Sequence, residues 1–409
     1  MAVTFSAILF VSTFLVFSSP ATAQQASGSW PMFRADPAHT GVGTGNPVLT
    51  VKLLWKYNTS GQIYSSPAVV DGVVYIGSLN GDIYALKADS GSRIWNYTTR
   101  GEIYSCPAVA GGVVYVGSAD GKVYALNAAS GEKLWSFTTG NQVDSSPAVV
   151  NGVVYVGSYD DNVYALNASN GAKLWAFSTL APIWSSPAVT GGVVYIGSTD
   201  GNIYALNASS GGKLWNYTNG NAVDSSPTVI GGFVYSGCEN GSVYALDAAD
   251  GTLVWSEAAG NEVKSSPAVA ESVVYIGSLD RNIYALNAAN GAKLWNYTTG
   301  DTVYSSPAVV DGAVYVGSRD GNVYSLNATS GAKIWSFVTG GYVESSPAVV
   351  GGVVYIGSLD GNVYALTSQI KAPNLSNVVA LAAVAILIVA AVAALLIAKN
   401  RRKKLKSVS

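Results

Sequence analysis

The chain has 409 residues and a formal net charge of −2; 11% of its residues are charged and 49% are hydrophobic. Its two cysteines are too few for a disulfide scaffold and lack metal-ligand spacing, and one histidine cannot build a Ser-His-Asp triad or a histidine-based metal site. Of the 22 Lys and Arg residues, six follow residue 398; the other 16 against 24 Asp and Glu give the remainder a net charge of about −8, which argues against nucleic acid as a partner.

The N-terminal 23 residues carry no charged side chain and include an apolar run, Ala7 to Phe17, followed by the small-residue motif Ala21-Thr22-Ala23. This pattern predicts a secretory signal peptide over residues 1–23. A short buried strand or helix is the alternative, because the basic n-region is missing. No cysteine follows the cleavage site, which excludes a lipoprotein anchor. Residues 24–47 form a leader segment, in which His39 is expected to close a turn.

A repeat of 40 residues fills the centre of the chain, residues 48–369. Each copy contains four short runs rich in Val, Ile and Tyr, separated by tight-turn signals such as Asp-Gly and Asn-Gly, so each copy predicts four strands. Two series of eight residues mark the repeat: a Ser-Pro proline at Pro67, Pro107, Pro147, Pro187, Pro227, Pro267, Pro307 and Pro347, and a tryptophan at Trp55, Trp95, Trp135, Trp175, Trp215, Trp255, Trp295 and Trp335.

This pattern predicts an all-β fold, an eight-bladed β-propeller of four-stranded blades. The runs are apolar almost throughout, as expected when neighbouring sheets cover both faces. A linear solenoid would need polar caps, and none is visible. Trp55 precedes the first Ser-Pro, and the last copy ends without its Trp strand. We therefore expect the N-terminal segment LLWKYNT to supply the outer strand of the eighth blade and close the ring.

The C-terminal part predicts a membrane anchor. After a linker, residues 370–377, residues 378–398 are uncharged and nearly all apolar, long enough to cross a hydrocarbon core of roughly 30 Å as one transmembrane helix. Six basic residues in the tail, residues 399–409, place that end in the cytoplasm by the positive-inside rule. A nucleic-acid contact of this basic run is the weaker alternative. The propeller is then expected outside the plasma membrane.

The eleven residues ALNAASGEKLW, Ala125 to Trp135, resemble the tryptophan-docking repeat of the quinoprotein (PQQ-repeat) β-propeller family: Ala first, Asp or Asn third, Gly seventh and Trp eleventh. Near-complete copies and a truncated one at Ala365 cover residues 48–369, whereas the marks of WD-type propellers are absent. The leader sequence WPMFRADPAHTG also resembles the segment before the first blade in secreted members. The eight Trp are expected to pack on the neighbouring blade, and Gly131 to take a conformation closed to other residues.

The resemblance implies the propeller fold more than it implies the dehydrogenase activity. Quinoprotein dehydrogenases of this family hold pyrroloquinoline quinone (PQQ) and Ca²⁺ with a Glu, Asn and Asp set, a catalytic Asp and a vicinal Cys pair. This chain has no Cys-Cys, no haem-attachment motif and no long loop insertions. Other members are assembly lipoproteins, extracellular sensor domains and archaeal surface proteins. We expect no catalytic residue, no metal and no cofactor; PQQ with Ca²⁺ belongs to the alternative.

The copies differ most just before the Ser-Ser-Pro motif, where one blade connects to the next. Eight such side chains should form a ring near the channel mouth, with Lys264 beside Asp224 and Trp184 between Asp144 and Asp224. Aromatic rings with carboxylates suit sugar rings, cationic groups or a protein loop. Neutral divergence of an exposed loop is the alternative. The predicted ligand-binding residues are Tyr64, Tyr104, Asp144, Trp184, Asp224, Lys264, Tyr304 and Glu344.

Two further patterns recur in the repeat: an Asp or Asn in the second turn of each copy, and Asn-X-Ser/Thr sequons. The Asp or Asn of the second turn is what a tight hairpin needs, so we interpret it as a turn residue and not a metal ligand; these are Asn80, Asp120, Asp160, Asp200, Asn240, Asp280, Asp320 and Asp360. Nine sequons predict glycosylation, at Asn58, Asn96, Asn167, Asn207, Asn216, Asn240, Asn296, Asn327 and Asn374, and four of them, Asn58, Asn96, Asn216 and Asn296, should lie on exposed outer strands. Cys106 and Cys238 differ in repeat position and are not expected to pair.

The sequence thus predicts a single-pass plasma-membrane protein with a monomeric propeller outside the cell. Its predicted function is non-catalytic binding of a cell-envelope protein or glycan. A PQQ-dependent quinoprotein oxidoreductase is the first alternative, and an extracellular sensor acting through a membrane partner is the second. The signal, sequons and anchor together suit an archaeal-type envelope.

Overall fold

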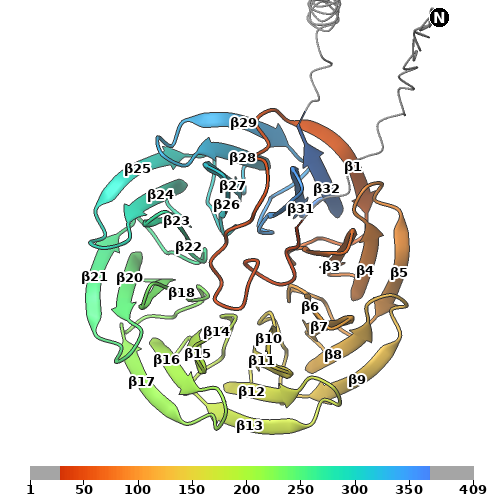
Figure 1. The fold of residues 1–409 in the computed structure, drawn as a ribbon, viewed down its shortest axis with the longest axis vertical. Helices are drawn as coiled ribbons and strands as arrows, with labels where there is room; N and C mark the ends of the chain where they lie inside the picture. Colours follow the sequence, from red (N-terminus) through yellow and green to blue (C-terminus); the bar gives the residue numbers. More distant parts are fainter. Residues whose placement is uncertain (1–27, 369–409) are drawn as a thin grey trace, which may run out of the picture. The chain divides into compact units, whose positions relative to one another are not determined.

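The computed structural model describes residues 28–368. The predicted signal peptide, linker, transmembrane span, basic tail and Asn374 lie outside these residues, and no helix within them is long and apolar enough to cross a membrane. The described part is all-β, with 32 strands in eight separate four-stranded sheets. The sheets stand around a common centre like the blades of a propeller (Figure 1). The predicted eight-bladed propeller is confirmed.

The two inner strands of each blade form a hairpin. The innermost strands have three residues and are β2 (Ala68–Val70), β6 (Ala108–Ala110), β10 (Ala148–Val150), β14 (Ala188–Thr190), β18 (Thr228–Ile230), β22 (Ala268–Ala270), β26 (Ala308–Val310) and β30 (Ala348–Val350). The second strands are β3 (Val73–Gly77), β7 (Val113–Ser118), β11 (Val153–Gly157), β15 (Val193–Gly197), β19 (Phe233–Gly237), β23 (Val273–Gly277), β27 (Ala313–Gly317) and β31 (Val353–Gly357).

The two outer strands complete each antiparallel sheet. The third strands are almost wholly buried and are β4 (Asp82–Lys87), β8 (Lys122–Asn127), β12 (Asn162–Asn167), β16 (Asn202–Asn207), β20 (Ser242–Asp247), β24 (Asn282–Asn287), β28 (Asn322–Asn327) and β32 (Asn362–Thr367). The outermost strands are β1 (Lys52–Asn58), β5 (Arg93–Thr98), β9 (Lys133–Thr138), β13 (Lys173–Ser178), β17 (Lys213–Thr218), β21 (Leu253–Ala258), β25 (Lys293–Thr298) and β29 (Lys333–Val338).

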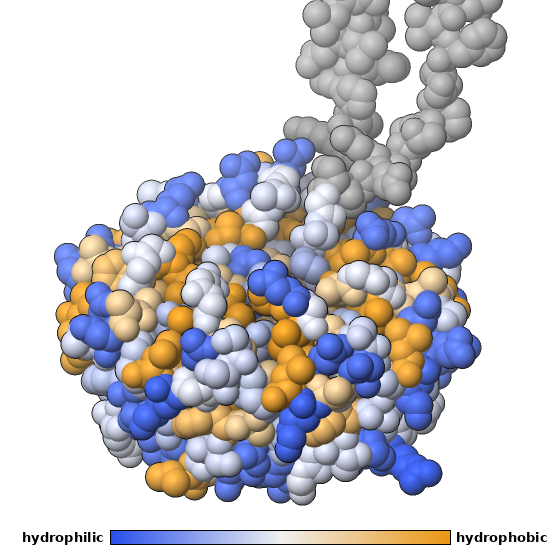
Figure 2. Space-filling model, turned by 60° about the horizontal axis from the view of Figure 1, so that its bottom comes forward, coloured by the Kyte–Doolittle hydropathy of each residue, from blue (hydrophilic) through white to orange (hydrophobic). Residues whose placement is uncertain are grey.

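In the outermost strands a tryptophan that is buried, or partly buried in β25, lies between mostly exposed neighbours. In β13, for example, Trp175 is buried whereas Leu174 is 51% exposed and Lys173 is exposed. Figure 2 shows apolar and hydrophilic side chains interspersed over the surface in that view. Charged side chains on an edge strand hinder its pairing with a strand of another chain. The charged residues of the outermost strands therefore offset the aggregation risk of their exposed leucines.

Each tryptophan joins its blade to the next one. Trp95 of β5 donates a hydrogen bond from Nε1 to the carbonyl of Ala128, 2.9 Å away in the following blade, and its ring lies 5.9 Å from that of Tyr75. A Cβ placed on Gly131 would lie 2.7 Å from the Trp95 ring, and Gly131 has φ 73°, so this position requires glycine for both reasons. The predicted docking role of the tryptophans is confirmed.

The ring is closed by strands from the two ends of the propeller. β1 pairs antiparallel with β32, with Trp55 opposite Ala365, and completes the sheet β1-β32-β31-β30. In the eighth blade the leader supplies the tryptophan-accepting carbonyl: Trp335 donates from Nε1 to the carbonyl of Val48 at 2.6 Å. The predicted closing strand is therefore confirmed, and Val48 completes the eighth blade.

A closed circle of hydrogen bonds runs around the channel through the second serine of each Ser-Ser-Pro motif. In each link the backbone N–H of one blade donates to the side chain of the next, as from Ser186 to Ser226 Oγ at 2.8 Å. Cys106 replaces one serine and accepts through Sγ, and the last link returns from Ser346 to Ser66 at 2.8 Å. We call this circle the serine girdle; its members are Ser66, Cys106, Ser146, Ser186, Ser226, Ser266, Ser306 and Ser346.

The leader crosses the centre of the ring, which the sequence did not predict (Figure 1). It exchanges two backbone hydrogen bonds between Trp30 and Val69 of the first blade, and Gly43 donates to the carbonyl of Val309 in the seventh blade at 2.9 Å. Buried Arg34 donates to the carbonyls of Pro267 and Pro307. Because Arg34 has left water, its pKa falls to about 9, and it stays charged at neutral pH.

His39 lies in a tight turn of the leader, with its backbone N–H donating to the carbonyl of Asp36 at 3.0 Å. Its side chain is 1% exposed, with Nδ1 3.2 Å from the carbonyl oxygen of Pro227. Burial, together with the charge of Arg34, lowers the pKa of His39 to about 3, so the imidazole is neutral. The leader therefore acts as a packed plug in the channel.

Candidate functional site

The eight predicted ligand-binding residues lie on one face of the propeller. Each follows an outermost strand and directly precedes the Ser-Ser-Pro motif. This connection is tied to the second turn of the next blade, as shown by the hydrogen bond from the N–H of Leu79 to the carbonyl of Gln62 at 2.9 Å. Trp184 is 48% exposed, and the other seven are partly buried. We call this ring of residues, with the second-turn residues that contact it, the mouth.

The first group at the mouth contains Asp144, Tyr159 and Trp184. The rings of Tyr159 and Trp184 stack, with centroids 5.1 Å apart and an interplanar angle of 13°. Tyr159 also forms a side-chain hydrogen bond with Asp144, whose Oδ1 is buried without a partner. Desolvation raises the pKa of Asp144 to about 6, despite the stabilising hydrogen bond from Tyr159. The group offers an exposed aromatic surface beside an acceptor with free hydrogen-bonding capacity.

The second group surrounds Lys264 with three carboxylates. Its Nζ lies 2.6 Å from Glu239, 3.3 Å from Asp224 and 3.6 Å from Glu262. The side chain of Asp224 is only 9% exposed, and its Oδ1 has no partner. Burial raises the pKa of Asp224 to about 6 even though Lys264 attracts the carboxylate. One lysine does not balance three acids, so this part of the mouth has an excess of negative charge.

The third group is built on Arg319. Its Nε donates to Glu344 Oε1 at 2.8 Å, and its guanidinium carbon lies 3.9 Å from the centroid of the Tyr304 ring. Burial raises the pKa of Glu344, and Arg319 opposes that shift. A shallow hollow of about 430 Å³ lies here and includes Tyr64 in its wall. The rings of Tyr64 and Tyr104 continue the surface, with centroids 5.5 Å apart.

The structure thus brings the predicted residues together in neighbouring sets and not as a single cluster. Asp224 contacts Lys264 directly, and Tyr64 contacts Tyr104. Trp184 instead stacks on a residue that the sequence interpretation missed. The missed members, Tyr159, Glu239 and Arg319, all occupy the first variable position of the second turn, where other blades have Leu, Ala or Thr. Comparing the eight copies at this second position of high divergence is the signal that finds them.

The acidic residues of the second turns have structural partners. Asp120 Oδ2 accepts a hydrogen bond from the hydroxyl of Tyr124 at 2.6 Å, and Asp160 Oδ2 accepts from the N–H of Gly140 at 2.5 Å. These bonds close the turn and tie it to the adjoining connection, in agreement with the turn interpretation. Asp161 and Arg281, which replace the turn glycine, have φ 69° and 77°. Both hold the left-handed conformation that glycine adopts at lower cost.

The sequons and cysteines occupy distinct environments. Asn58, Asn96, Asn216 and Asn296 are exposed on outermost strands, as predicted. Asn167, Asn207 and Asn327 are half-buried and accept backbone hydrogen bonds through Oδ1, for example from Ser169 to Asn167 at 2.9 Å; Asn240 is exposed in a second turn. Glycosylation itself stays a prediction. Both cysteines are buried and free, so they do not form a disulfide.

The side chains present do not fit the PQQ and Ca²⁺ site of quinoprotein dehydrogenases. Cys106 and Cys238 lie in different blades, so no vicinal pair exists. Asp224 and Glu344 form ion pairs with Lys264 and Arg319. Within residues 28–368 no group of three or more His, Cys, Asp or Glu side chains is arranged to hold a metal ion.

Closed four-stranded blades joined by docked tryptophans define the class as an eight-bladed β-propeller of tryptophan-docking repeats. The PQQ-repeat family model described as outer membrane protein assembly factor BamB matches residues 49–143, 119–239, 200–307 and 301–371. The chain belongs to this PQQ-repeat propeller family.

Solved structures share the fold at low sequence identity. BamB from Moraxella catarrhalis is 21% identical with a TM-score of 0.69, and the match covers 78% of this chain and 100% of that one. A europium-containing methanol dehydrogenase is 15% identical with a TM-score of 0.72, covering 83% and 98%. A quinohemoprotein alcohol dehydrogenase from Comamonas testosteroni is 17% identical with a TM-score of 0.71, covering 85% and 82%. No curated protein sequence matches the chain significantly. The fold is therefore shared by an assembly factor and by dehydrogenases.

Proposed function

We propose that this protein is a non-catalytic binding scaffold of the cell envelope and that it holds its partner at the mouth. The observation that carries the proposal is the convergence of the variable repeat positions on one face. There Asp144 and Asp224 each keep a buried oxygen without a partner, and Asp144 belongs to the same group as the exposed ring of Trp184. A buried acceptor without a hydrogen bond costs roughly 1–3 kcal/mol, which a bound donor recovers.

The chemistry of the mouth favours a protein partner that presents basic or amide donors. Aromatic side chains supply contact area at low entropic cost, and a negatively charged surface steers a positively charged segment toward it. The family model and the structural likeness to BamB support an assembly role. A glycan ligand is the remaining alternative within this proposal. The predicted signal and anchor put the monomeric propeller outside the plasma membrane, with the C-terminus in the cytoplasm.

Site-directed photocrosslinking in the native envelope tests the proposal. A photoreactive amino acid replaces Trp184 in the full chain, and the control carries it at Leu174, which is equally exposed on an outermost strand. We expect one discrete protein adduct from position 184 that is absent from position 174 and is lost when Asp144→Asn and Asp224→Asn are added. Equal labelling at both positions, or none at the mouth, contradicts the proposal.

The dehydrogenase alternative has its own test. Structural likeness to the methanol and alcohol dehydrogenases is the observation that favours it. Calorimetric titration of the full chain with PQQ and Ca²⁺, followed by dye reduction with simple alcohols, separates the two functions. Tight quinone binding with turnover overturns the scaffold proposal.

A further inference from the structure

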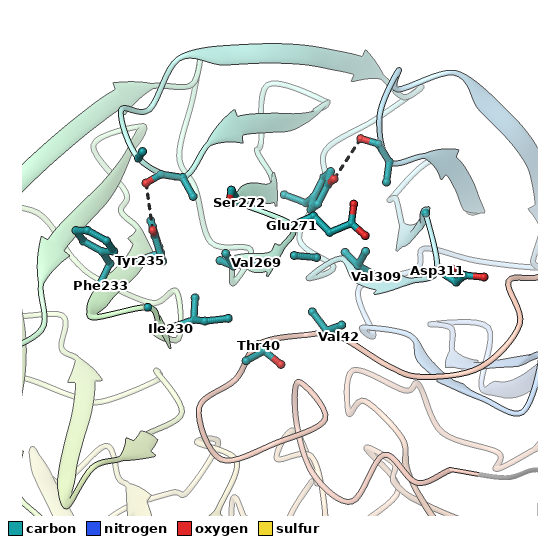
Figure 3. A pocket seen from close by; sticks show the side chains of 17 residues that line it. Thr40, Val42, Ile230, Phe233, Tyr235, Val269, Glu271, Ser272, Val309 and Asp311 are labelled. Atoms are coloured by element: carbon teal, nitrogen blue, oxygen red, sulfur yellow. Dashed lines mark hydrogen bonds between the residues drawn. The ribbon is translucent and has the colours of Figure 1, made fainter.

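A second site lies on the face opposite the mouth, between the leader and the fifth to seventh blades. A cavity of about 530 Å³ opens there, within the size range of small-molecule sites. Its inner wall is formed by Thr40 and Val42 of the leader, and its outer wall includes Phe233 and Val269 (Figure 3). Because the first hairpin turns lie at the other end of the inner strands from the Ser-Ser-Pro motif, this cavity and the mouth are separate.

The wall is mainly apolar and is held in a fixed shape by hydrogen bonds. The N–H of Val269 donates to the carbonyl of Thr40 at 3.0 Å, and the N–H of Val309 donates to the carbonyl of Gly41 at 2.8 Å. The hydroxyl of Tyr235 donates to the carbonyl of Ala288 at 3.1 Å, which keeps that ring on the wall. Backbone hydrogen bonds therefore fix the leader in place as one wall of the cavity.

Residues that break the repeat gather at this cavity. Phe233 stands where six blades have Val and one has Ala, and Glu271-Ser272 replaces a turn that ends in Gly in the seven other blades. Glu271 and Ser272 have φ 48° and 63°. Non-glycine residues in this region cost of order 1 kcal/mol each and cluster at functional sites. The blades that line the cavity thus depart from the repeat where they face it.

The charge at the rim has one sign. Glu271 and Asp311 are both exposed there, and none of the seventeen lining residues is Lys, Arg or His. Figure 3 shows Glu271 extending toward the Val309 side of the cavity. The aromatic side chains of Phe233 and Tyr235 add apolar surface to the wall, which suits the hydrocarbon part of a ligand. An apolar interior with acidic residues at its rim complements a molecule with an apolar body and a cationic head.

We propose that this cavity binds a small amphipathic cation, with its hydrocarbon part between the leader and Phe233 and its ammonium group at Glu271 and Asp311. The site is independent of the mouth and of the proposed scaffold function. Exposed ion pairs are weak, so the apolar contact supplies most of the affinity and the carboxylates supply the selectivity for charge.

Calorimetric titration of the full chain with three eight-carbon probes tests the proposal at low salt. The probes are octylammonium, octanol and octanoate, which share the chain and differ in charge. We expect octylammonium to bind with a dissociation constant of about 1 mM or below. Octanol should bind roughly tenfold more weakly and octanoate more weakly still. Equal affinities for the three probes, or no binding of octylammonium, overturn the proposal.

Variants on the exposed turns locate the site without disturbing the core. Glu271→Gln combined with Asp311→Asn should reduce octylammonium affinity to that of octanol. Asp71→Asn, at the same turn position in the first blade, is the matched control and should change nothing. If instead Asp144→Asn with Asp224→Asn abolishes octylammonium binding while the turn variants retain it, the cation binds at the mouth and the proposal is wrong.

Discussion

Each serine girdle residue lies two residues after a mouth residue along the chain, and the two positions differ in almost every property. Each girdle position is serine except Cys106, and the backbone N–H of each girdle residue donates a hydrogen bond to the girdle side chain of the next blade. The residue directly before the Ser-Ser pair is Tyr, Asp, Trp, Lys or Glu, and two of these acids keep an unpaired oxygen. Positions that the fold requires are therefore uniform, and positions that it does not require are free to acquire a ligand.

Among the changes at positions that the fold requires, removal of the closing strand β1 should reduce stability the most. A chain that starts at Gly61 lacks β1 and the leader, and so loses the buried side chains of Trp55 and Arg34 together with the pairing of β32. Loss of a buried Trp alone costs about 3–5 kcal/mol. We expect the calorimetric melting temperature to fall by at least about 10 °C with a broadened transition.

The matched control for that deletion starts at Gly28 and keeps every described residue. It should melt as the full chain does. An unchanged melting temperature for the chain starting at Gly61 would show that the ring does not depend on closure by β1.

Breaking one link of the girdle should have a smaller effect. Ser226→Ala removes the acceptor for the buried N–H of Ser186. An unsatisfied buried donor costs about 1–3 kcal/mol. Denaturant unfolding should show this loss, whereas Ser90→Ala on an exposed turn should leave stability unchanged. Equal effects of the two substitutions contradict the girdle's role.

At the mouth, by contrast, we expect a substitution of Asp144 to stabilise the protein. Its pKa is raised from 3.8 to about 6, so the native state takes up a proton more readily than the unfolded chain. The stability from this difference is fully present below pH 3.8 and is lost as pH rises through 6. Asp144→Asn should therefore raise the free energy of unfolding at pH 7, by up to about 3 kcal/mol.

The measurement is the difference in unfolding free energy between wild type and Asp144→Asn from pH 4 to 7.5. Using the difference cancels the contributions of Asp224 and Glu344, whose pKa values are also raised. The gain from the substitution should grow with pH across this window. A pH-independent difference means that Asp144 is not desolvated.

The sequence predicted the ring because its determinants are local and repeated. Tight-turn glycines, apolar strands and the tryptophan at each fortieth residue each specify one blade, and the early Trp55 specifies closure. It did not predict the path of the leader, because Arg34 and His39 contact the carbonyls of prolines more than 180 residues away and occur only once. No internal copy exists from which such contacts can be inferred.

The mouth was predicted in part for the same reason. Comparing the copies found the ring of residues before Ser-Ser-Pro, since eight versions of one position can be compared. It missed Tyr159, Glu239 and Arg319, because their contacts depend on how the second turn meets the adjoining connection. The pairing of two variable positions is a property of the folded blade.

Two tryptophans nine residues apart, Trp175 and Trp184, allow the uniform and the variable positions to be compared for the same residue type. Trp175 belongs to the uniform set: it is buried and donates from Nε1 to Ala208 at 2.9 Å. Trp184 belongs to the variable set, and its stack on Tyr159 is worth roughly 0.5–1.5 kcal/mol. Trp175→Ala should cost about 3–5 kcal/mol and Trp184→Ala about 1 kcal/mol or less in denaturant unfolding. If the two substitutions destabilise equally, the mouth is part of the structural framework, and its divergence among blades says nothing about binding.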